Sequence, residues 1–191
     1  MKKTIKIAAL FLAAAMLFAG CANSSSSSSG DNDKKVDNIT LSDGKWIIDV
    51  TEKETSSMSG QSSTEIDELH LEVTIEGEKV TLTKGIEKRH NHDEEDITSY
   101  AKYQYNKLDS IAPERLLNGP SSNYLSGDMP EIKKYGNDDG TKFRAKATAS
   151  ETITAAELAA LLTFFGGNGG DITGDLKVTY TGEVEYSKQS E

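Results

Sequence analysis

Apolar and polar residues alternate along several segments of this chain, with the period of two that is typical of β-strands with one buried face. Residues 69–84 show it most clearly, and the alternation there passes through Glu76-Gly77-Glu78-Lys79. A two-residue loop at Gly77-Glu78 suits a type II′ turn, because glycine then takes the first central position. With this loop the facing pairs are Ile75 and Val80, Val73 and Leu82, and Glu76 and Lys79. Both apolar pairs share one face, so the segment predicts a β-hairpin.

Three other segments carry the same alternation. Residues 44–51 place Trp46 on the apolar face, residues 143–149 alternate Phe and Ala with basic residues and Thr, and residues 176–186 form a long terminal segment. Each predicts a strand with one wet face. Residues 51–65 are rich in Ser, Thr and Glu, so we expect a polar loop there.

A helix is predicted over residues 154–165. Thr154 and Glu157 have the spacing of a capping box, and Ile153 and Leu158 are placed for a hydrophobic staple around it. The expected apolar stripe is Leu158, Leu161, Leu162 and Phe165, and the expected end of the helix is Gly166-Gly167.

The middle of the chain is harder to interpret. Residues 97–108 fit a strand and also a helical stripe, and their tyrosines favour the strand slightly. Residues 113–118 fit a short helix that begins at Pro113 and ends before Gly119. Residues 119–140 contain two prolines and four glycines, which favours a long irregular segment that binds something or moves.

These elements predict an α+β fold made mainly of antiparallel strands. We expect five or six strands in a meander-like sheet or partial barrel, with one helix from the C-terminal half packed on it. Gly44-Lys45-Trp46 at the first strand, and a late helix before a last strand, resemble the ends of a lipocalin-like domain. That family is an eight-stranded barrel, and the resemblance implies a carrier of a small apolar ligand.

The first twenty residues have the three parts of a secretory signal peptide. Three lysines precede an apolar run over residues 7–18, and small residues then lead to Cys21. The apolar run is shorter than the roughly 20 residues that span a bilayer. Leu17-Phe18-Ala19-Gly20-Cys21 resembles the lipobox of bacterial lipoproteins. The resemblance implies cleavage before Cys21, acylation of its thiol with fatty chains such as palmitate, and anchoring to a membrane.

By composition, the chain divides into a membrane anchor, a tether and a domain. Residues 21–39 hold six consecutive serines and predict a flexible tether, which leaves residues 40–191 as a single strand-rich domain. The formal charge is −10, and it becomes −13 when the three lysines of residues 1–20 are removed. This balance argues against a nucleic-acid partner. Ala22 lacks the Asp that resembles an inner-membrane retention signal, so the outer membrane or cell surface is favoured over the inner membrane.

Two segments are candidates for metal ions. His90 and His92 lie two residues apart beside Asp93, and on an extended segment their imidazoles would point the same way, as zinc ligands can. His70 is the candidate for a third ligand. Residues 166–171 match the first six positions of a calcium nonapeptide repeat, in a single copy. Most such segments are solvated loops, so we expect no cofactor, with zinc or calcium as the alternative.

No catalytic motif stands out. The chain has no Gly-x-Ser-x-Gly elbow and no phosphate-binding loop, and its 31 acidic residues offer too many carboxylate pairs to choose from. The sequence therefore favours a non-catalytic envelope lipoprotein that binds a small molecule or a protein. The alternatives are a metal-binding lipoprotein and a lipocalin-like carrier. Aromatic candidates for contact with a ligand or partner are Trp46, Tyr103, Tyr105, Tyr124 and Tyr135.

Overall fold

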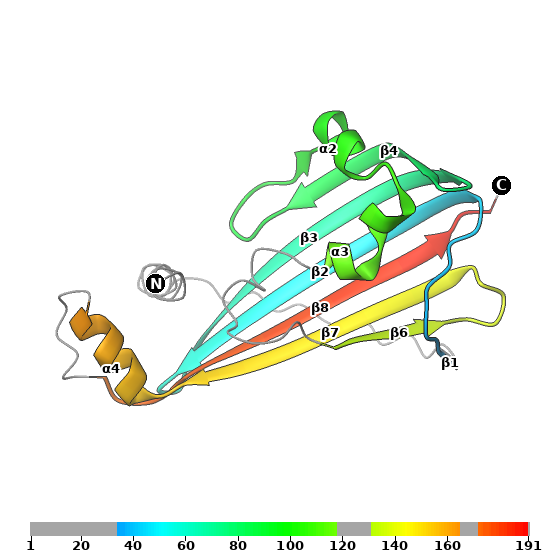
Figure 1. Ribbon diagram of the computed structural model, residues 1–191. Coiled ribbons are helices and arrows are strands. Elements are labelled where there is room, and N and C mark those ends of the chain that lie inside the picture. Colours follow the sequence, from blue (N-terminus) through cyan, green and yellow to red (C-terminus); the bar gives the residue numbers. More distant parts are fainter. Residues whose placement is uncertain (1–33, 118–130, 165–171, 191) are drawn as a thin grey trace.

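The structure is a computed structural model that describes residues 34–117, 131–164 and 172–190. It is built on one antiparallel sheet of eight strands in the order β1-β6-β7-β8-β2-β3-β4-β5 (Figure 1). The strands are β1 (Lys34–Lys35), β2 (Gly44–Met58), β3 (Gln61–Glu76), β4 (Lys79–Lys88), β5 (Glu95–Asp96), β6 (Ile132–Gly136), β7 (Lys142–Ile153) and β8 (Leu176–Lys188). The helices are α2 (Thr98–Gln104), the 3-10 helix η1 (Leu108–Ile111), α3 (Pro113–Leu116) and α4 (Ala155–Phe164).

The predicted fold class is confirmed in its main part, since the structure is mainly antiparallel sheet. The expected five or six strands are too few, because the short strands β1 and β5 and the five-residue strand β6 carry too little alternation to be recognised. The sheet is not closed: β1 and β5 form its two edges. One main helix, α4 of the C-terminal half, is present as expected, and the shorter helices α2, η1 and α3 cover one face of the sheet.

We call the covered face the inner face and the opposite one the outer face. The main core lies between the inner face and the helices, where Trp46, Ile48 and Leu71 of the sheet are buried against Ala101 and Ile111. Figure 1 shows α2 and α3 over this part of the sheet and α4 at the other end of the long strands. The inner face is therefore apolar near α2 and α3.

The predicted hairpin at Gly77-Glu78 is confirmed. β3 and β4 pair Ile75 with Val80 and Glu76 with Lys79, as the alternation requires. Gly77 has a φ of 59°, and Glu78 is not among the described residues with positive φ. This combination fits a type II′ turn, which needs a positive φ at the first central position only.

The polar loop expected over residues 51–65 is wrong. β2 and β3 stay paired from Gly44 and Ile75 to Met58 and Gln61, and the chain reverses at Ser59-Gly60, where φ is 51° and 81°. β8 pairs with the other side of β2 as far as Ser57. Backbone hydrogen bonds on both sides keep this segment extended although few of its side chains are apolar.

The preference for a strand over residues 97–108 is also wrong, because residues 98–104 form α2. Ala101 is fully buried against the sheet, whereas Tyr100 and Tyr103 are exposed. The hydroxyl oxygen of Thr98 accepts the Gly85 N–H at 2.9 Å and holds the start of α2 against β4. Burial of one small residue thus outweighs the strand preference of the tyrosines.

The long irregular segment expected over residues 119–140 contains β6, which pairs with β7. The short helix expected at Pro113 is present as α3. Residues 118–130, with Tyr124, and the glycine-rich residues 166–171 lie outside the described residues, as do Cys21 and most of the expected tether. Lys34 and Lys35, which the sequence placed in that tether, pair with β6, and Ile39 and Leu41 pack on the core.

The capping box of α4 is confirmed. The Thr154 N–H donates to Glu157 Oε2 at 2.8 Å, and the Glu157 N–H donates to Thr154 Oγ1 at 3.3 Å. Ile153 and Leu158 meet in a second, smaller apolar cluster. Across residues 34–117, 131–164 and 172–190, no helix has the length and apolar character needed to cross a membrane.

Candidate functional site

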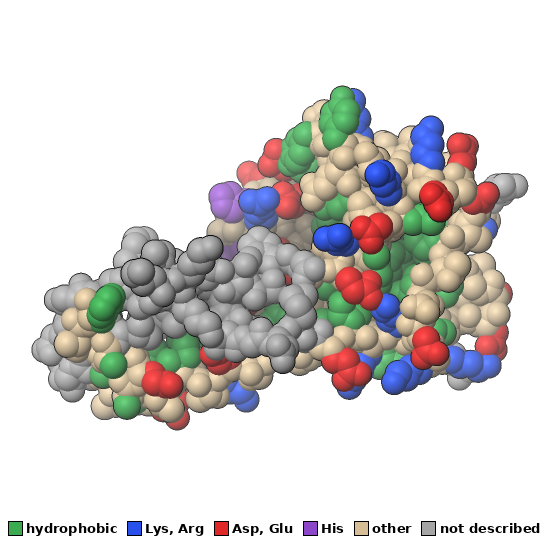
Figure 2. Space-filling view, viewed as in Figure 1, with side chains coloured by type: hydrophobic (Ala, Val, Ile, Leu, Met, Phe, Trp, Pro, Cys, Tyr) green, Lys and Arg blue, Asp and Glu red, His purple; other side chains and the backbone are tan. Residues whose placement is uncertain are grey.

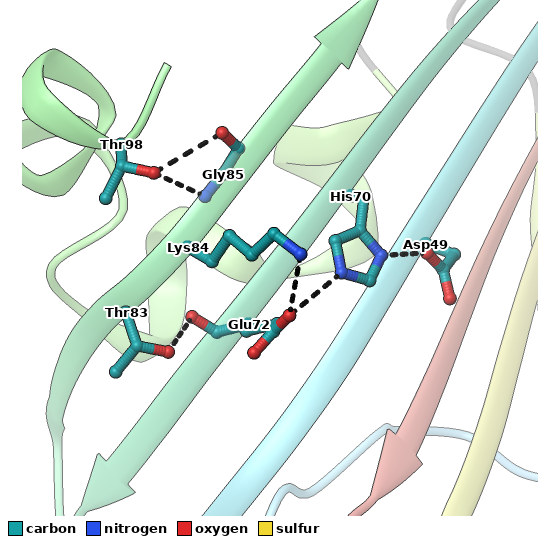
Figure 3. A network of polar contacts seen from close by, with 7 residues as sticks. All are labelled: Asp49, His70, Glu72, Thr83, Lys84, Gly85 and Thr98. Carbon is teal, nitrogen blue, oxygen red and sulfur yellow. Dashed lines mark hydrogen bonds and ion pairs between the residues drawn. The ribbon is translucent and has the colours of Figure 1, made fainter. Parts of the chain in front are cut away.

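On the outer face, charged side chains meet partners of opposite sign. His70 lies between two carboxylates: its Nδ1 is 2.7 Å from Asp49 Oδ1 and its Nε2 is 3.5 Å from Glu72 Oε1 (Figure 3). Lys84 Nζ is 3.3 Å from the same Glu72 oxygen, and hydrogen bonds from Lys84 and then His70 lower the pKa of Glu72. Exposed pairs of this kind contribute little to stability, but they show that the outer face is balanced in charge.

Beyond the apolar core, the inner face carries acidic side chains. Glu52 and Glu54 of β2, with Glu65 and Asp67 of β3, form what we call the acidic block. In the register of the two strands Glu52 lies directly opposite Asp67, and Glu54 directly opposite Glu65. Like charges directly opposite each other on one face of a sheet are destabilising. Two such pairs follow each other along β2 and β3.

Two carboxylates of the block have donors from the protein. The Tyr180 hydroxyl donates to Glu52 Oε1 at 2.6 Å and also lies 3.2 Å from the Leu117 carbonyl oxygen. Asp67 Oδ1 accepts the backbone N–H of His90 at 2.8 Å. These bonds hold the two side chains that are nearest the helices.

Glu54 is the least satisfied member of the block. Its side chain is 7% exposed, and its Oε2 atom has no hydrogen-bond partner among the described residues. Burial, and then the charges of Glu65 and Asp67, together raise the pKa of Glu54 to about 7. No basic side chain of the described chain opposes this rise. Near neutral pH this carboxyl therefore exchanges a proton readily.

A pocket of about 240 Å³ lies between the acidic block and the helices. Glu52 and Asp67 line it on the sheet side, and Gln104, Tyr105 and Arg115 line it on the helix side. Apolar side chains from Val50, Leu69 and Leu116 complete the wall. The pocket is therefore lined by apolar and charged side chains together. On the face viewed in Figure 2, acidic and basic side chains are interspersed around apolar ones over the region of α2 and α3.

The basic residues of this pocket have acidic neighbours of their own. Arg89 Nη2 is 3.1 Å from a carboxylate oxygen of Glu87, and Arg115 Nη2 is 3.4 Å from Asp109. A second pocket, of about 320 Å³, lies between residues 38–41 and α3, where Lys134 Nζ is 2.5 Å from Glu114 Oε1. Both pockets therefore have lining side chains that form ion pairs within the chain.

The histidines predicted as metal ligands are not brought together. Asn91 has a φ of 59°, and the His92 N–H donates to the Arg89 carbonyl, so this segment turns instead of extending as the prediction required. His70 is engaged with Asp49 and Glu72 on the outer face. In the part of the chain that the structure describes, no three His, Cys, Asp or Glu side chains, Asp93 included, are placed to hold one metal ion.

Of the described aromatic candidates, Tyr105 alone lines the pocket beside the acidic block. Trp46 is 1% exposed and belongs to the core, so it is not available to a ligand. Tyr103 is exposed on α2, and Tyr135 lies under the Arg144 guanidinium at 5.8 Å.

Comparison with known proteins does not assign a family to this chain. No protein-family model, no curated protein and no solved structure matches this chain.

Sequence reasoning missed the acidic block because it treated residues 51–65 as a loop. The signal was nevertheless present: Glu52 and Glu54 precede Ser59-Gly60 by the same spacing at which Glu65 and Asp67 follow it. A hairpin centred on that turn places all four on one face.

Proposed function

We propose that this protein is a lipoprotein of the cell envelope, held on the outer membrane or cell surface, whose domain binds a small ligand or part of a partner without catalysis. The binding place is the pocket between the acidic block and α2 and α3. The observation that carries the proposal is the pocket of about 240 Å³ itself, in which Glu52 and Asp67, directly opposite each other on β2 and β3, lie beside apolar side chains such as Val50 and Leu69.

The shape of the inner face favours this form of binding over a lipocalin-like carrier. The sheet is open, and Ala101, Ile111, Leu116 and Leu117 fill the space over its apolar part. An apolar molecule of lipid size would compete with these side chains. A pocket with a mixed polar and apolar wall suits a small amphipathic group instead.

The anchor is supported by the lipobox-like residues 17–21. Residues 22–33 precede β1, and six of them are consecutive serines. By composition alone, a serine-rich spacer of this length is expected to have a mean reach of about 19 Å. Such a spacer keeps the domain near the membrane and lets it turn toward a ligand.

The anchor is tested by mass spectrometry of the purified chain and by membrane fractionation. We expect acyl chains on Cys21 and membrane association that is lost in Cys21→Ala. An unmodified Cys21 in a released protein would contradict the anchored form of the proposal.

The pocket is tested by thermal shift of the full chain in non-ionic detergent against a panel of cationic, neutral and anionic small molecules. Gln104 is exposed and lines the pocket, so Gln104→Trp should fill it without disturbing the core. Lys102→Trp changes an exposed residue of the same helix that does not line the pocket, and it serves as the matched control. We expect a panel member whose shift is lost only in Gln104→Trp, and shifts equal in both variants would contradict the proposed site.

A further inference from the structure

We propose that the second pocket, between residues 36–43 and the helices η1 and α3, is a separate binding site for a small uncharged molecule. Its ligand has an apolar body and one carbonyl group, whose oxygen accepts a hydrogen bond from Lys134. This site is distinct from the pocket beside the acidic block and does not depend on a ligand there.

Residues 36–43, which we call the crossing segment, form one wall of this pocket. They join β1, at the edge of the sheet, to β2 in its middle, and Figure 1 shows them passing over the sheet beside α3. The Val36 N–H donates to a carbonyl of β6 at 3.0 Å, and the Ser42 carbonyl accepts the Trp46 Nε1–H at 2.8 Å. These bonds fix both ends of the segment, and residues 38–41 between them line the pocket of about 320 Å³. This volume lies at the lower end of the range of ligand pockets, so it suits a small molecule.

The wall of the pocket is mainly apolar. Ile39 and Leu41 of the crossing segment and Leu108 of η1 line it, and all three are partly buried against the main core. Ile111 and Tyr186, each 1% exposed, belong to that core and line the pocket too. Apolar atoms that border a void lack contact partners on that side, and an apolar ligand supplies them. The pocket therefore favours a ligand with an apolar body.

Lys134 is the basic residue of the pocket. Its Nζ is 2.5 Å from Glu114 Oε1, and its side chain is 15% exposed. An ammonium has three N–H donors, so Lys134 can donate to a ligand without losing its contact with Glu114. The Tyr186 hydroxyl, by contrast, already donates to the Ile111 carbonyl at 2.8 Å. Lys134 is thus the mostly buried donor that the polar group of a ligand can use.

The ion pair also determines which charge a ligand can have. Lys134 and Glu114 are oppositely charged, and the other residues that line the pocket are uncharged at neutral pH. A carboxylate on the ligand would be repelled by Glu114 and an ammonium by Lys134, and such repulsion is stronger in a partly buried place than in water. An uncharged carbonyl accepts the hydrogen bond without either repulsion.

The test is a protein-observed NMR titration of the full chain in non-ionic detergent, with 2-heptanone as the probe. Dialysis measures the free probe, because detergent takes up part of it. We expect saturable shifts of the methyl signals of Ile39, Leu41 and Leu108. Thr40 is exposed and lines the pocket, so Thr40→Trp should fill it and weaken binding at least tenfold. Thr81→Trp makes the same change at an exposed position of β4 that lines neither pocket, and it should bind as the unchanged protein does.

A second pair of variants tests the hydrogen bond. Lys134→Met should weaken binding about tenfold, since a hydrogen bond from a charged donor is lost. Lys133→Met removes the same charge from the neighbouring exposed residue and should leave binding unchanged. Circular dichroism of each variant establishes that it is folded. Heptanoate and heptylamine test the charge of the ligand, and each should bind at least tenfold more weakly than 2-heptanone.

Several outcomes would overturn the second site. These are the absence of saturable methyl shifts, equal binding in Thr40→Trp and Thr81→Trp, equal binding in Lys134→Met and Lys133→Met, and tighter binding of either charged probe. Binding of 2-heptanone that is lost in Gln104→Trp and retained in Thr40→Trp would place the probe beside the acidic block. That result would overturn the second site and support the proposed function.

Discussion

Tyr180 of β8 donates its hydroxyl to Glu52 of β2 at 2.6 Å, across the inner face of the sheet. The same hydroxyl is 3.2 Å from the carbonyl oxygen of Leu117, directly after α3. Burial and then the bond to Glu52 raise the pKa of Tyr180 well above its usual range, so the group remains a donor at any ordinary pH. The Tyr180 hydroxyl thus connects β8 with β2 and with the residue that follows α3, at the edge of the acidic block.

Tyr180→Phe should lower the free energy of unfolding by about 1–2 kcal/mol, because the part-buried hydrogen bond from the Tyr180 hydroxyl to Glu52 is lost. Urea unfolding followed by circular dichroism measures the change. Tyr103→Phe, at a position 73% exposed, is the control and should be neutral. Equal stability of both variants would mean that the Tyr180 hydroxyl does not stabilise the contact between the sheet and the end of α3.

Gly182→Ala should destabilise the fold strongly, although it adds only one methyl group. A Cβ at this position would overlap the Tyr180 hydroxyl and lie 2.8 Å from Leu117 Cδ2, both in the buried core. We expect a loss of about 2–4 kcal/mol in the same unfolding assay, since well-packed cores resist added atoms. Thr181→Ala, on the neighbouring exposed residue, provides the comparison and should change little.

Glu54→Gln should stabilise the protein above neutral pH. The folded state raises the pKa of Glu54 from 4.5 to about 7, so the folded protein holds this proton more tightly than the unfolded chain does. Stability therefore falls as the pH rises from about 4.5 to about 7, and the variant avoids that fall, by roughly 1–3 kcal/mol. Thermal unfolding from pH 4 to pH 9 should give curves that diverge as the pH increases. A constant difference at every pH would contradict the titration of Glu54.

Trp46 should report on the core and not on the ligand. It is the only tryptophan of the chain, it is 1% exposed, and its ring stacks on Phe143 with centroids 6.1 Å apart. Its emission should be blue-shifted and resistant to iodide quenching. Trp46→Phe should cost about 2 kcal/mol, because the hydrogen bond from Nε1 to the Ser42 carbonyl at 2.8 Å is lost with part of the packing. Strong quenching of the folded protein would contradict its burial.

The sequence predicted those elements whose evidence is local. The hairpin at Gly77-Glu78 follows from an alternation that only one loop position satisfies, and the start of α4 follows from Thr154 and Glu157. The strands around Trp46, around Phe143 and at the C-terminal end follow from the same period of two. Of the site, Tyr105 alone was among the predicted residues and lines the pocket.

The remaining features depend on neighbours that are distant in the chain. α2 is a helix because Ala101 fits against the sheet, and β1 and β6 are strands because each finds a paired edge. The acidic block exists because the β2–β3 hairpin continues through residues without an apolar pattern, where β8 supplies hydrogen bonds. Local alternation determines which face of a strand is apolar, whereas pairing between strands determines which charges confront each other. For this reason the sequence by itself established the hairpin at Gly77-Glu78 and the type of fold, and only the tertiary structure decided that four carboxylates share one place.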